Sequence, residues 1–280
     1  MTAFQGSIEI RQIYKVFGTQ PDKALGRLKA GASKQDILQE LGCHVGLNNV
    51  SMHIPAGKIF VIMGLSGSGK STLVRHFNRL IEPTSGEIFV NGNNVMNLDP
   101  SGLRTLRRQT MSMVFQSFGL LPHKTVQDNV AYGLSIRGHK IQDASKHIQH
   151  WIDRVGLKGY EHSYPDELSG GMRQRVGLAR ALAMDTPILL MDEAFSALDP
   201  LIRHDMQTLL LELQNTLQKT IVFITHDLDE ALRIGANIAI LRDGELVQTG
   251  TPEQILTEPA DDYVRRFVEK RTLVNEANPH

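Results

Sequence analysis

The sequence lacks the features that would place it outside a cell or inside a membrane. Its 280 residues include one cysteine, Cys43, so no disulfide can form within the chain and a reducing compartment is expected. No apolar run approaches the roughly 18 residues of a membrane-spanning helix. Residues 1–6 lack the charged and apolar regions of a signal peptide. We therefore expect a cytoplasmic protein that reaches a membrane only through a partner.

The chain also lacks an excess of charge of either sign. Thirty basic residues balance thirty acidic ones, which argues against a polyanion-binding surface and so against a nucleic-acid partner. Hydrophobic residues make up 41% of the chain, enough to bury a sizeable core. The length permits one large domain or two small ones.

Residues 64–71, Gly-Leu-Ser-Gly-Ser-Gly-Lys-Ser, are the most informative segment. They fit Gly-x-x-x-x-Gly-Lys-[Ser/Thr] between an apolar strand, 59–63, and a helix-compatible segment, 72–77. Such a loop turns its backbone N–H groups toward phosphates. Lys70 is expected to reach the β- and γ-phosphates, and the Ser71 hydroxyl to bind Mg²⁺. A glycine-rich turn without a ligand is the alternative. The nucleotide-binding residues expected here are Gly64, Ser66, Gly67, Gly69, Lys70, Ser71 and Thr72.

Two carboxylates follow another apolar run. Residues 188–191 indicate a strand buried on both faces of a parallel sheet, and Asp192 and Glu193 come at its carboxyl end, where open α/β sheets bind ligands. Asp192 fits the Mg²⁺-holding acid of phosphate-loop hydrolases, and Glu193 could orient or deprotonate the attacking water. A solvated acidic pair is the alternative, which the phosphate loop disfavours because a bound nucleotide needs a metal-binding acid.

A second glycine loop precedes a helix-forming segment, residues 176–183. Ser169 can cap that helix, while Gly170 and Gly171 let the backbone approach an oxyanion. A plain helix cap would explain these residues equally well. Since one nucleotide needs a single cradle, two glycine loops suggest that two copies of the chain share each ATP.

The rest of the chain indicates an alternation of strands and helices. From about 117 to 180 the pattern is helical, and residues 19–46 form an insert interrupted by proline and glycines. Within the insert, Ser33 and Asp36 predict a capping box that opens a short helix. The polar segment 269–280 is expected to be loosely ordered. Further predicted strands are 7–17, 49–54, 87–90, 112–115 and 220–224, with a helix at 202–217 and an Asp-Gly hairpin at 241–247.

In this order, the segments resemble the ATPase subunits of ABC transporters over residues from about 8 to 250. The residues that carry the resemblance are Phe17, 64–71, Gln116, 168–174, Asp192, Glu193, 196–199 and His226. A narrower resemblance, to the ATPases of glycine betaine/proline/choline importers, lies in residues 62–71, 113–118, 163–176 and 192–203, and in the insert.

The resemblance implies an α/β P-loop NTPase: a RecA-like parallel sheet core, an N-terminal antiparallel β subdomain and an inserted helical subdomain, together one nucleotide-binding domain over 1–280. It implies ATP and Mg²⁺ as cofactors and a homodimer that works with integral membrane permease subunits. A periplasmic, lipid-anchored or fused substrate-binding protein would complete the importer of quaternary amines such as glycine betaine, proline betaine, choline or carnitine. The protein would be peripheral, on the cytoplasmic face of the inner membrane.

Single residues acquire roles through the same resemblance. Phe17 would stack on adenine, Gln116 would approach Mg²⁺ and the attacking water, His226 would contact the γ-phosphate, and Asp199 would lie across the dimer interface. The catalytic set is then Glu193, His226, Gln116 and Lys70, and the metal set is Ser71, Gln116 and Asp192. Without the resemblance, Phe17 could be a core aromatic, His226 an ordinary histidine and the segment around Asp199 a turn.

Two departures and three alternatives accompany this interpretation. Met172 stands where the wider family usually has glutamine. The quaternary-amine branch of the family resembles this chain at that position. Many relatives continue into C-terminal regulatory domains, whereas this sequence ends at His280, so the resemblance does not extend to gating by ionic strength or a regulatory nucleotide. The alternatives are a soluble ABC ATPase without a permease, an importer of another small cationic or amino-acid-like substrate, and a regulatory module without turnover. Glu193 and His226 argue against the last.

Overall fold

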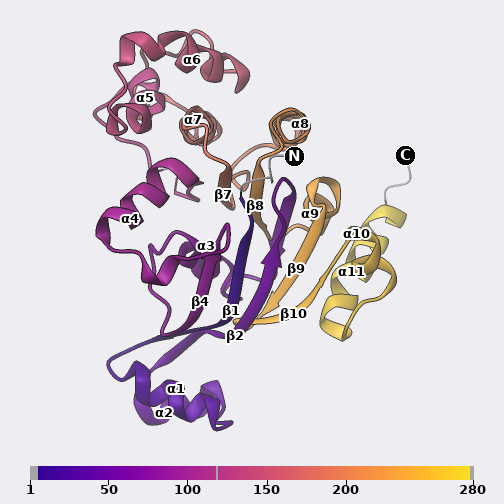
Figure 1. Cartoon of the computed structure of the whole chain (residues 1–280). Coiled ribbons are helices and arrows are strands. Elements are labelled where there is room, and N and C mark those ends of the chain that lie inside the picture. Colours follow the sequence, from indigo (N-terminus) through magenta and orange to yellow (C-terminus); the bar gives the residue numbers. More distant parts are fainter. Residues whose placement is uncertain (1–5, 118, 278–280) are drawn as a thin grey trace. The chain divides into compact units, whose positions relative to one another are not determined.

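The computed structural model describes residues 6–117 and 119–277. The chain divides into two compact units, each described here by itself: residues 1–103 with 224–280, and residues 104–223. Figure 1 labels the elements of both. Among the described residues, no helix has the length and apolar character needed to cross a membrane.

The first unit contains an antiparallel sheet with the strand order β2-β1-β4-β5. Ile8 pairs with Ile54 on one side and with Val90 on the other. The alternating apolar residues of β1 are buried, as the sequence predicted. The predicted antiparallel β subdomain is therefore confirmed. Its strands are β1 (Ile8–Phe17), β2 (His44–Ile54), β4 (Ser85–Val90) and β5 (Asn93–Asn94).

The insert forms two helices, α1 (Pro21–Lys29) and α2 (Lys34–Leu41). The predicted capping box of α2 is present, with Ser33 and Asp36 each accepting the other's backbone N–H. The sequence interpretation missed α1 because it took the proline as an interruption. A proline at the first helical position instead suits a helix, since its missing N–H has no intrahelical partner there.

The first unit also holds three strands of a second sheet, in the order β10-β9-β3. They are β3 (Ile59–Met63), β9 (Asn237–Arg242) and β10 (Glu245–Gly250). β3 is buried along its whole length and runs parallel to β9. The predicted hairpin is confirmed: β9 and β10 are antiparallel, and Asp243 and Gly244 between them have φ values of +49° and +75°.

The last helix of the first unit extends into the polar segment at the end of the sequence. Residues 269–277 form the second half of α11, while 278–280 lie outside the described residues. The helix starts well before the polar segment, and Val264 in its first turn is fully buried. Helices α4, α9, α10 and α11 were not predicted from the sequence. The helices are α3 (Lys70–Phe77), α4 (Pro100–Thr105, across the unit boundary), α9 (Leu228–Ile234), α10 (Pro252–Thr257) and α11 (Asp262–Ala277), with a 3₁₀ turn η1 (Val95–Asn97).

The second unit has strands in the order β8-β7-β6 and a group of helices. The strands are β6 (Met111–Val114), β7 (Ile188–Asp192) and β8 (Thr220–Thr225), whose last two residues belong to the first unit. β6 and β7 are parallel, and β7 and β8 are fully buried, as predicted from their unbroken apolar runs.

Three helices fill most of the segment predicted to be helical. They are α5 (Val126–Ile136), α6 (Ile141–Arg154) and α7 (Gly170–Ala183), which pack against one another. The predicted cap at Ser169 is confirmed, although α7 begins at the glycines themselves and not after them. The unit also contains a π-helical turn η2 (Leu106–Thr110), a 3₁₀ turn η3 (Pro165–Glu167) and α8 (Pro200–Leu217).

Candidate functional site

The phosphate loop lies between β3 and α3, in the order that the motif predicts. Gly64 has a φ of +152°, and a Cβ atom there would lie 2.2 Å from the carbonyl oxygen of Leu241. The loop therefore packs its backbone directly on β9 and accepts no side chain at this position. Lys70 is 4% exposed, and its ammonium donates to the carbonyl oxygens of Gly64 and Leu65, each at 2.9 Å. The positive charge is thus held inside the loop.

Phe17, at the end of β1, is 40% exposed and so is not a core aromatic. A Cβ atom on Gly46 of β2 would lie 2.7 Å from Cε2 of the Phe17 ring, and one on Gly69 would lie 2.9 Å from the Gly46 oxygen. The backbone of Gly46 therefore lies between the Phe17 ring and the phosphate loop, with no side chain in between. The ammonium of Lys15 lies 4.9 Å from the centroid of the ring, a contact that sequence reasoning missed.

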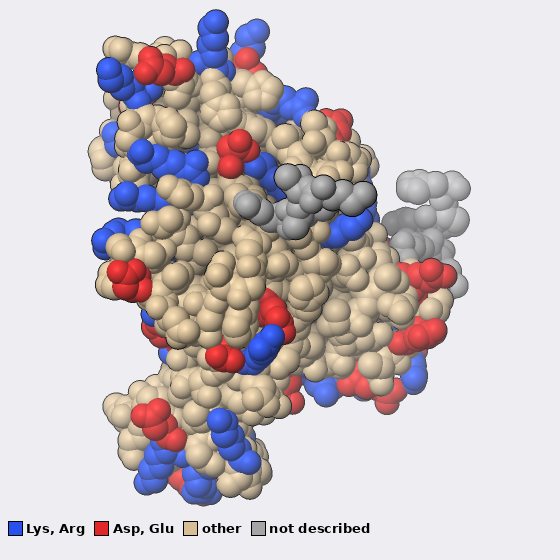
Figure 2. Space-filling model, viewed as in Figure 1, with Lys and Arg blue, Asp and Glu red and all other residues tan. Residues whose placement is uncertain are grey.

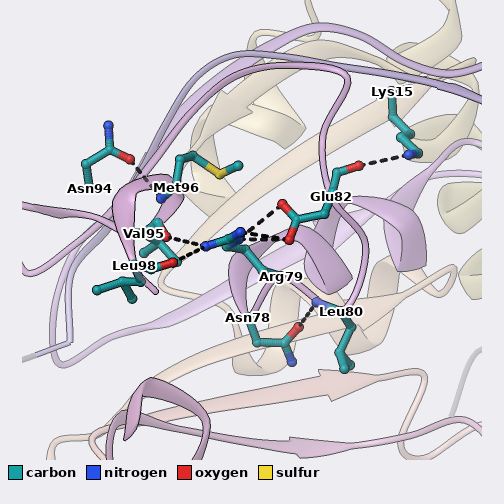
Figure 3. A network of polar contacts seen from close by, with 9 residues as sticks. All are labelled: Lys15, Asn78, Arg79, Leu80, Glu82, Asn94, Val95, Met96 and Leu98. Carbon is teal, nitrogen blue, oxygen red and sulfur yellow. Dashed lines mark hydrogen bonds and ion pairs between the residues drawn. The ribbon is translucent and has the colours of Figure 1, made fainter. Parts of the chain in front are cut away.

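A polar network follows the C-terminal end of α3 (Figure 3). The Arg79 guanidinium donates to the carbonyl oxygens of Val95 and Leu98, at 3.0 and 3.1 Å, and pairs with Glu82 at 2.9 Å. The Lys15 ammonium donates to the backbone oxygen of Glu82 at 2.8 Å. The segment after the phosphate-loop helix is thereby joined to the lysine that lies over the exposed aromatic ring.

His226 follows β8 and is exposed, on the short loop before α9. The next residue, Asp227, caps α9 by accepting from the backbone N–H groups of Asp229 and Glu230, at 2.9 and 3.2 Å. Its own N–H donates to the Thr225 hydroxyl at 3.0 Å. These bonds fix the backbone immediately after the histidine, in the unit that also contains the phosphate loop.

The second unit brings three predicted residues together at the carboxyl ends of β6 and β7. Asp192 is fully buried, so it is not part of a solvated acidic pair. Glu193 has a φ of +48°, a left-handed conformation that is uncommon for such a residue and is found at functional sites. Its carboxylate accepts a hydrogen bond from Nε2 of Gln116 at 2.9 Å. The sequence predicted both carboxylates but not this contact.

The second glycine loop lies in the same unit, at the start of α7. The Ser169 hydroxyl accepts from the Met172 N–H at 3.2 Å. Apart from its chain neighbours and the nearby backbone of its own helix, a Cβ placed on Gly170 would meet no heavy atom of the described residues within 4 Å. A Cβ on Gly171 would lie 3.2 Å from the Leu198 side chain. The glycine loop and the segment leading to α8 are therefore neighbours.

Asp199 caps α8 and does not merely form a turn. Its carboxylate accepts from the Ile202 N–H at 3.1 Å, and Pro200 occupies the first helical position. The side chain of Asp199 is exposed.

Gln174 on α7 is buried, and its amide nitrogen approaches the backbone oxygen of Glu193 at 3.4 Å. The helix that the second glycine loop opens is therefore linked to the residue after β7.

Each side chain proposed as a metal ligand carries an oxygen of the kind that Mg²⁺ prefers. Ser71, the second residue of α3, supplies a hydroxyl, Asp192 a buried carboxylate, and Gln116 an amide whose nitrogen already bonds Glu193, so that its oxygen is the atom suited to a cation. Mg²⁺ prefers such hard oxygen ligands and usually binds through one or two carboxylates together with phosphates and water. In the described part of the chain, no group of three or more His, Cys, Asp or Glu residues could hold a metal by itself.

The fold and these two glycine loops define an ATP-binding cassette, and comparison with known proteins agrees. Residues 47–196 match the ABC transporter family. The dimeric structure of a bacterial ABC transporter cassette superposes with a TM-score of 0.76 at 31% identity, over 88% of this chain and 98% of that one. A cassette dimer with bound ADP and Pi gives the same TM-score at 30% identity, with the same coverage. The chain belongs to the ABC transporter family.

Three relatives are similar over almost the whole chain. The glycine betaine/carnitine transport ATP-binding protein GbuA of Listeria monocytogenes is 57% identical over 94% of this chain. The glycine betaine/proline betaine transport ATP-binding protein ProV of Escherichia coli is 55% identical over 93%, and the trimethylamine N-oxide transport ATP-binding protein TmoW of Ruegeria pomeroyi is 51% identical over 95%. The chain spans 66% of the length of GbuA, 65% of ProV and 79% of TmoW.

Proposed function

We propose that this chain is the ATP-hydrolysing subunit of an importer of quaternary amines, such as glycine betaine, proline betaine, choline or carnitine. The similarity to transport ATP-binding proteins for glycine betaine, carnitine and proline betaine, at 55–57% identity over more than nine-tenths of the chain, supports the substrate class. A choline transport ATP-binding protein is 43% identical over 83% of the chain. The observation that carries hydrolysis, as opposed to nucleotide binding alone, is the hydrogen-bonded position of Glu193 beside the buried Asp192.

In this proposal each unit contributes its own groups. From the first, the backbone of residues 64–72 and the Lys70 ammonium bind the phosphates, Phe17 stacks on adenine, and His226 contacts the γ-phosphate. From the second, Glu193 deprotonates or orients the attacking water. Mg²⁺, held by Ser71, Gln116 and Asp192, would neutralise charge on the phosphates. Positioning and charge stabilisation account for most of the catalysis of phosphoryl transfer.

The second glycine loop supports a dimer in which each copy completes the site of its partner. Ser169 and Gly170 are accessible at the N-terminus of a 14-residue helix, which suits an anionic ligand. Two copies paired head to tail would trap two ATP–Mg²⁺ between phosphate loop and second glycine loop. ATP would favour the closed pair and hydrolysis would release it. A solved relative that superposes on this chain is dimeric.

The remaining partners follow from the same proposal. Integral permease subunits would contact the helical segment 117–180, and a periplasmic, lipid-anchored or fused substrate-binding protein would deliver the amine. The subunit would be peripheral, on the cytoplasmic face of the inner membrane, without a nucleic-acid partner. The amine itself would be selected by the binding protein and permease.

One experiment tests both the association with a membrane permease and the proposed substrate class. The protein is isolated from native membranes, the integral subunits that accompany it are identified, and the complex is reconstituted in vesicles. We expect ATP-dependent uptake of labelled glycine betaine, with choline, carnitine and trimethylamine N-oxide as competitors, and no uptake with Glu193→Gln. Recovery without any integral subunit would favour a soluble ABC ATPase. ATP-dependent uptake that none of these amines competes with would favour another substrate.

A further inference from the structure

The helical insert has a small apolar core of its own. Ala24, Leu28 and Ile37 from its two helices are buried against Tyr14 and Val16 of β1. On the face of α1 and α2 that Figure 2 shows, both basic and acidic side chains are present. They include the exposed ion pair between Arg27 and Glu40.

One residue of the insert reaches a distant part of the same unit. The capping box of Ser33 and Asp36 fixes the start of α2, so the first residue of the helix, Lys34, has a defined direction. Its ammonium donates to the backbone oxygen of Asp243 and lies 3.3 Å from a carboxylate oxygen of Glu245. Lys34 therefore holds both sides of the β9–β10 turn, 209 residues away in sequence.

The same turn is bonded to the phosphate loop. The Gly244 N–H donates to the carbonyl oxygen of Ser68 at 3.0 Å, and the Gly244 oxygen accepts from the Asn48 N–H at 2.8 Å. The Asn48 side chain donates to Glu245 at 2.7 Å. Lys34 and Asn48 thus share the Glu245 carboxylate, and Ser68 of the phosphate loop is attached at the centre of the turn.

Close backbone packing makes this attachment stiff. A Cβ atom on Gly244 would lie 2.4 Å from the Gly46 oxygen, and one on Gly69 would lie 2.9 Å from the same oxygen. Three backbone segments are therefore in direct contact, with no side chain between them to absorb a displacement. Because the Phe17 ring also rests on Gly46, a shift of the turn would be felt by the aromatic ring and by the phosphate loop together.

We propose that Lys34 is a positioning residue for the nucleotide site, and that the insert serves to hold the β9–β10 turn against the phosphate loop. The inference rests on the proposed nucleotide binding but adds a role for the insert. Lys34 touches no nucleotide in this proposal, since it acts through Gly244 and Ser68. The ion pair is exposed, and such pairs are worth little individually, so the expected loss of affinity is about two- to fivefold.

The test compares Lys34→Met with Arg27→Met in the full chain. Both remove an exposed ion pair of the insert, but Arg27 pairs within the insert and does not contact the turn. With Mg·ADP as the probe in calorimetric titrations, Lys34→Met is expected to weaken binding about two- to fivefold, Arg27→Met to leave it unchanged, and Lys34→Arg to restore it. Hydrogen exchange at the Gly244 amide should quicken in Lys34→Met and not in Arg27→Met.

Glu245→Gln gives an independent approach if Lys34→Met folds poorly. Glutamine keeps an oxygen that can accept from Asn48 but removes the charge that pairs with Lys34, so the same loss of affinity is expected. Wild-type affinity in both Lys34→Met and Glu245→Gln would overturn the inference, as would an equal loss in Arg27→Met. A wild-type protein that does not bind Mg·ADP at all would instead overturn the proposed function, and this inference with it.

Discussion

Gln116 donates a hydrogen bond from its side-chain nitrogen to a carboxylate oxygen of Glu193, with 2.9 Å between the two atoms. The residues are 77 apart in sequence but follow neighbouring parallel strands, β6 and β7, whose carboxyl ends share one edge of the sheet. Gln116 also begins the segment that leads to α5. The orientation of the candidate base therefore depends on a residue connected to the helical part of the unit.

Replacement of the candidate base should separate turnover from binding. In Glu193→Gln, we expect kcat for ATP to fall by about a hundredfold or more, because general-base catalysis contributes at least that much. The affinity for ATP should stay near that of the wild type, since the phosphate loop is unchanged. Steady-state phosphate release and equilibrium ATP binding measure the two quantities, and gel filtration with ATP should show more dimer. Hydrolysis at the wild-type rate would remove Glu193 from its role.

The contact with Gln116 predicts a non-additive effect. Gln116→Met removes one hydrogen bond to a charged group, worth about 1.5–3 kcal/mol, so kcat should fall by about tenfold or more while ATP affinity changes little. If glutamine acts only by orienting Glu193, the double variant Gln116→Met/Glu193→Gln should be no slower than Glu193→Gln alone. A multiplicative loss in the double variant would instead assign the effect on turnover to the Mg²⁺ contact proposed for Gln116, which does not act through Glu193.

Lys15 is expected to contribute to recognition of the base. Its ammonium is held by the Glu82 carbonyl and lies over the Phe17 ring, and an exposed cation–π contact of this kind is worth about 0.5–1 kcal/mol. Lys15→Met should therefore weaken ATP binding about two- to fivefold, through a ring that is less well held. Fluorescence titration with a ribose-labelled ATP analogue would measure the change.

Two controls distinguish base recognition from a general disturbance of β1. Inorganic tripolyphosphate has no base, so its affinity should be the same in Lys15→Met and in the wild type. Arg11 on the same strand forms a comparable contact with Phe89, at 4.4 Å from the ring centroid, and Arg11→Met should leave ATP binding unchanged. Equal losses for ATP and tripolyphosphate would place the effect on the phosphate loop and contradict the prediction.

The sequence predicted those parts of the fold that short-range patterns specify. The strand–loop–helix unit around Lys70, the buried strands β7 and β8, the capping box of α2 and the Asp-Gly hairpin each depend on residues close together in the chain. A signal for α10 was also present but not used: Thr251, Pro252 and Gln254 form a proline-led capping box.

Contacts between distant segments could not be predicted in this way. Nothing in the local sequence indicates that Gly46 would separate Phe17 from the phosphate loop, or that Lys34 would reach Asp243. The polar composition of residues 269–277 did not indicate a helix, whereas α11 runs from Asp262 to Ala277 with the buried Val264 in its first turn. Burial and long-range contact decided these positions, and neither is visible in composition.

A buried histidine behind the phosphate loop predicts how stability depends on pH. His76 on α3 is fully buried, and burial lowers its pKa to about 4. The nearby Lys15 ammonium lowers the pKa further, against the opposing effects of the Thr72 carbonyl and the Glu82 carboxylate. Nδ1 lies 2.6 Å from the Thr72 oxygen and so carries the proton, while Nε2 is buried without a hydrogen-bond partner among the described residues.

The lowered pKa of His76 determines whether stability rises or falls with pH. An unfolded histidine has a pKa near 6.5, so between pH 6.5 and about 4 the unfolded state binds more protons than the folded one. The contribution of His76 is complete above pH 6.5 and is lost as the pH falls through this interval. From pH 7 to pH 5 the loss in free energy of unfolding should be ~2 kcal/mol. His76→Gln should lose ~2 kcal/mol less than the wild type over this interval.

Urea unfolding followed by far-UV circular dichroism at pH 7 and pH 5 measures this difference. The chain has 11 histidines and 30 acidic residues in all, and many of them contribute to how the free energy of unfolding changes with pH. The prediction therefore concerns the difference in that change between variant and wild type. His53, exposed on β2, is the matched control, and His53→Gln should keep the wild-type dependence. If His76→Gln lost as much stability between pH 7 and pH 5 as the wild type, the prediction would be wrong. His76 would then have to be protonated in the folded protein, although Nε2 has no acceptor among the described residues.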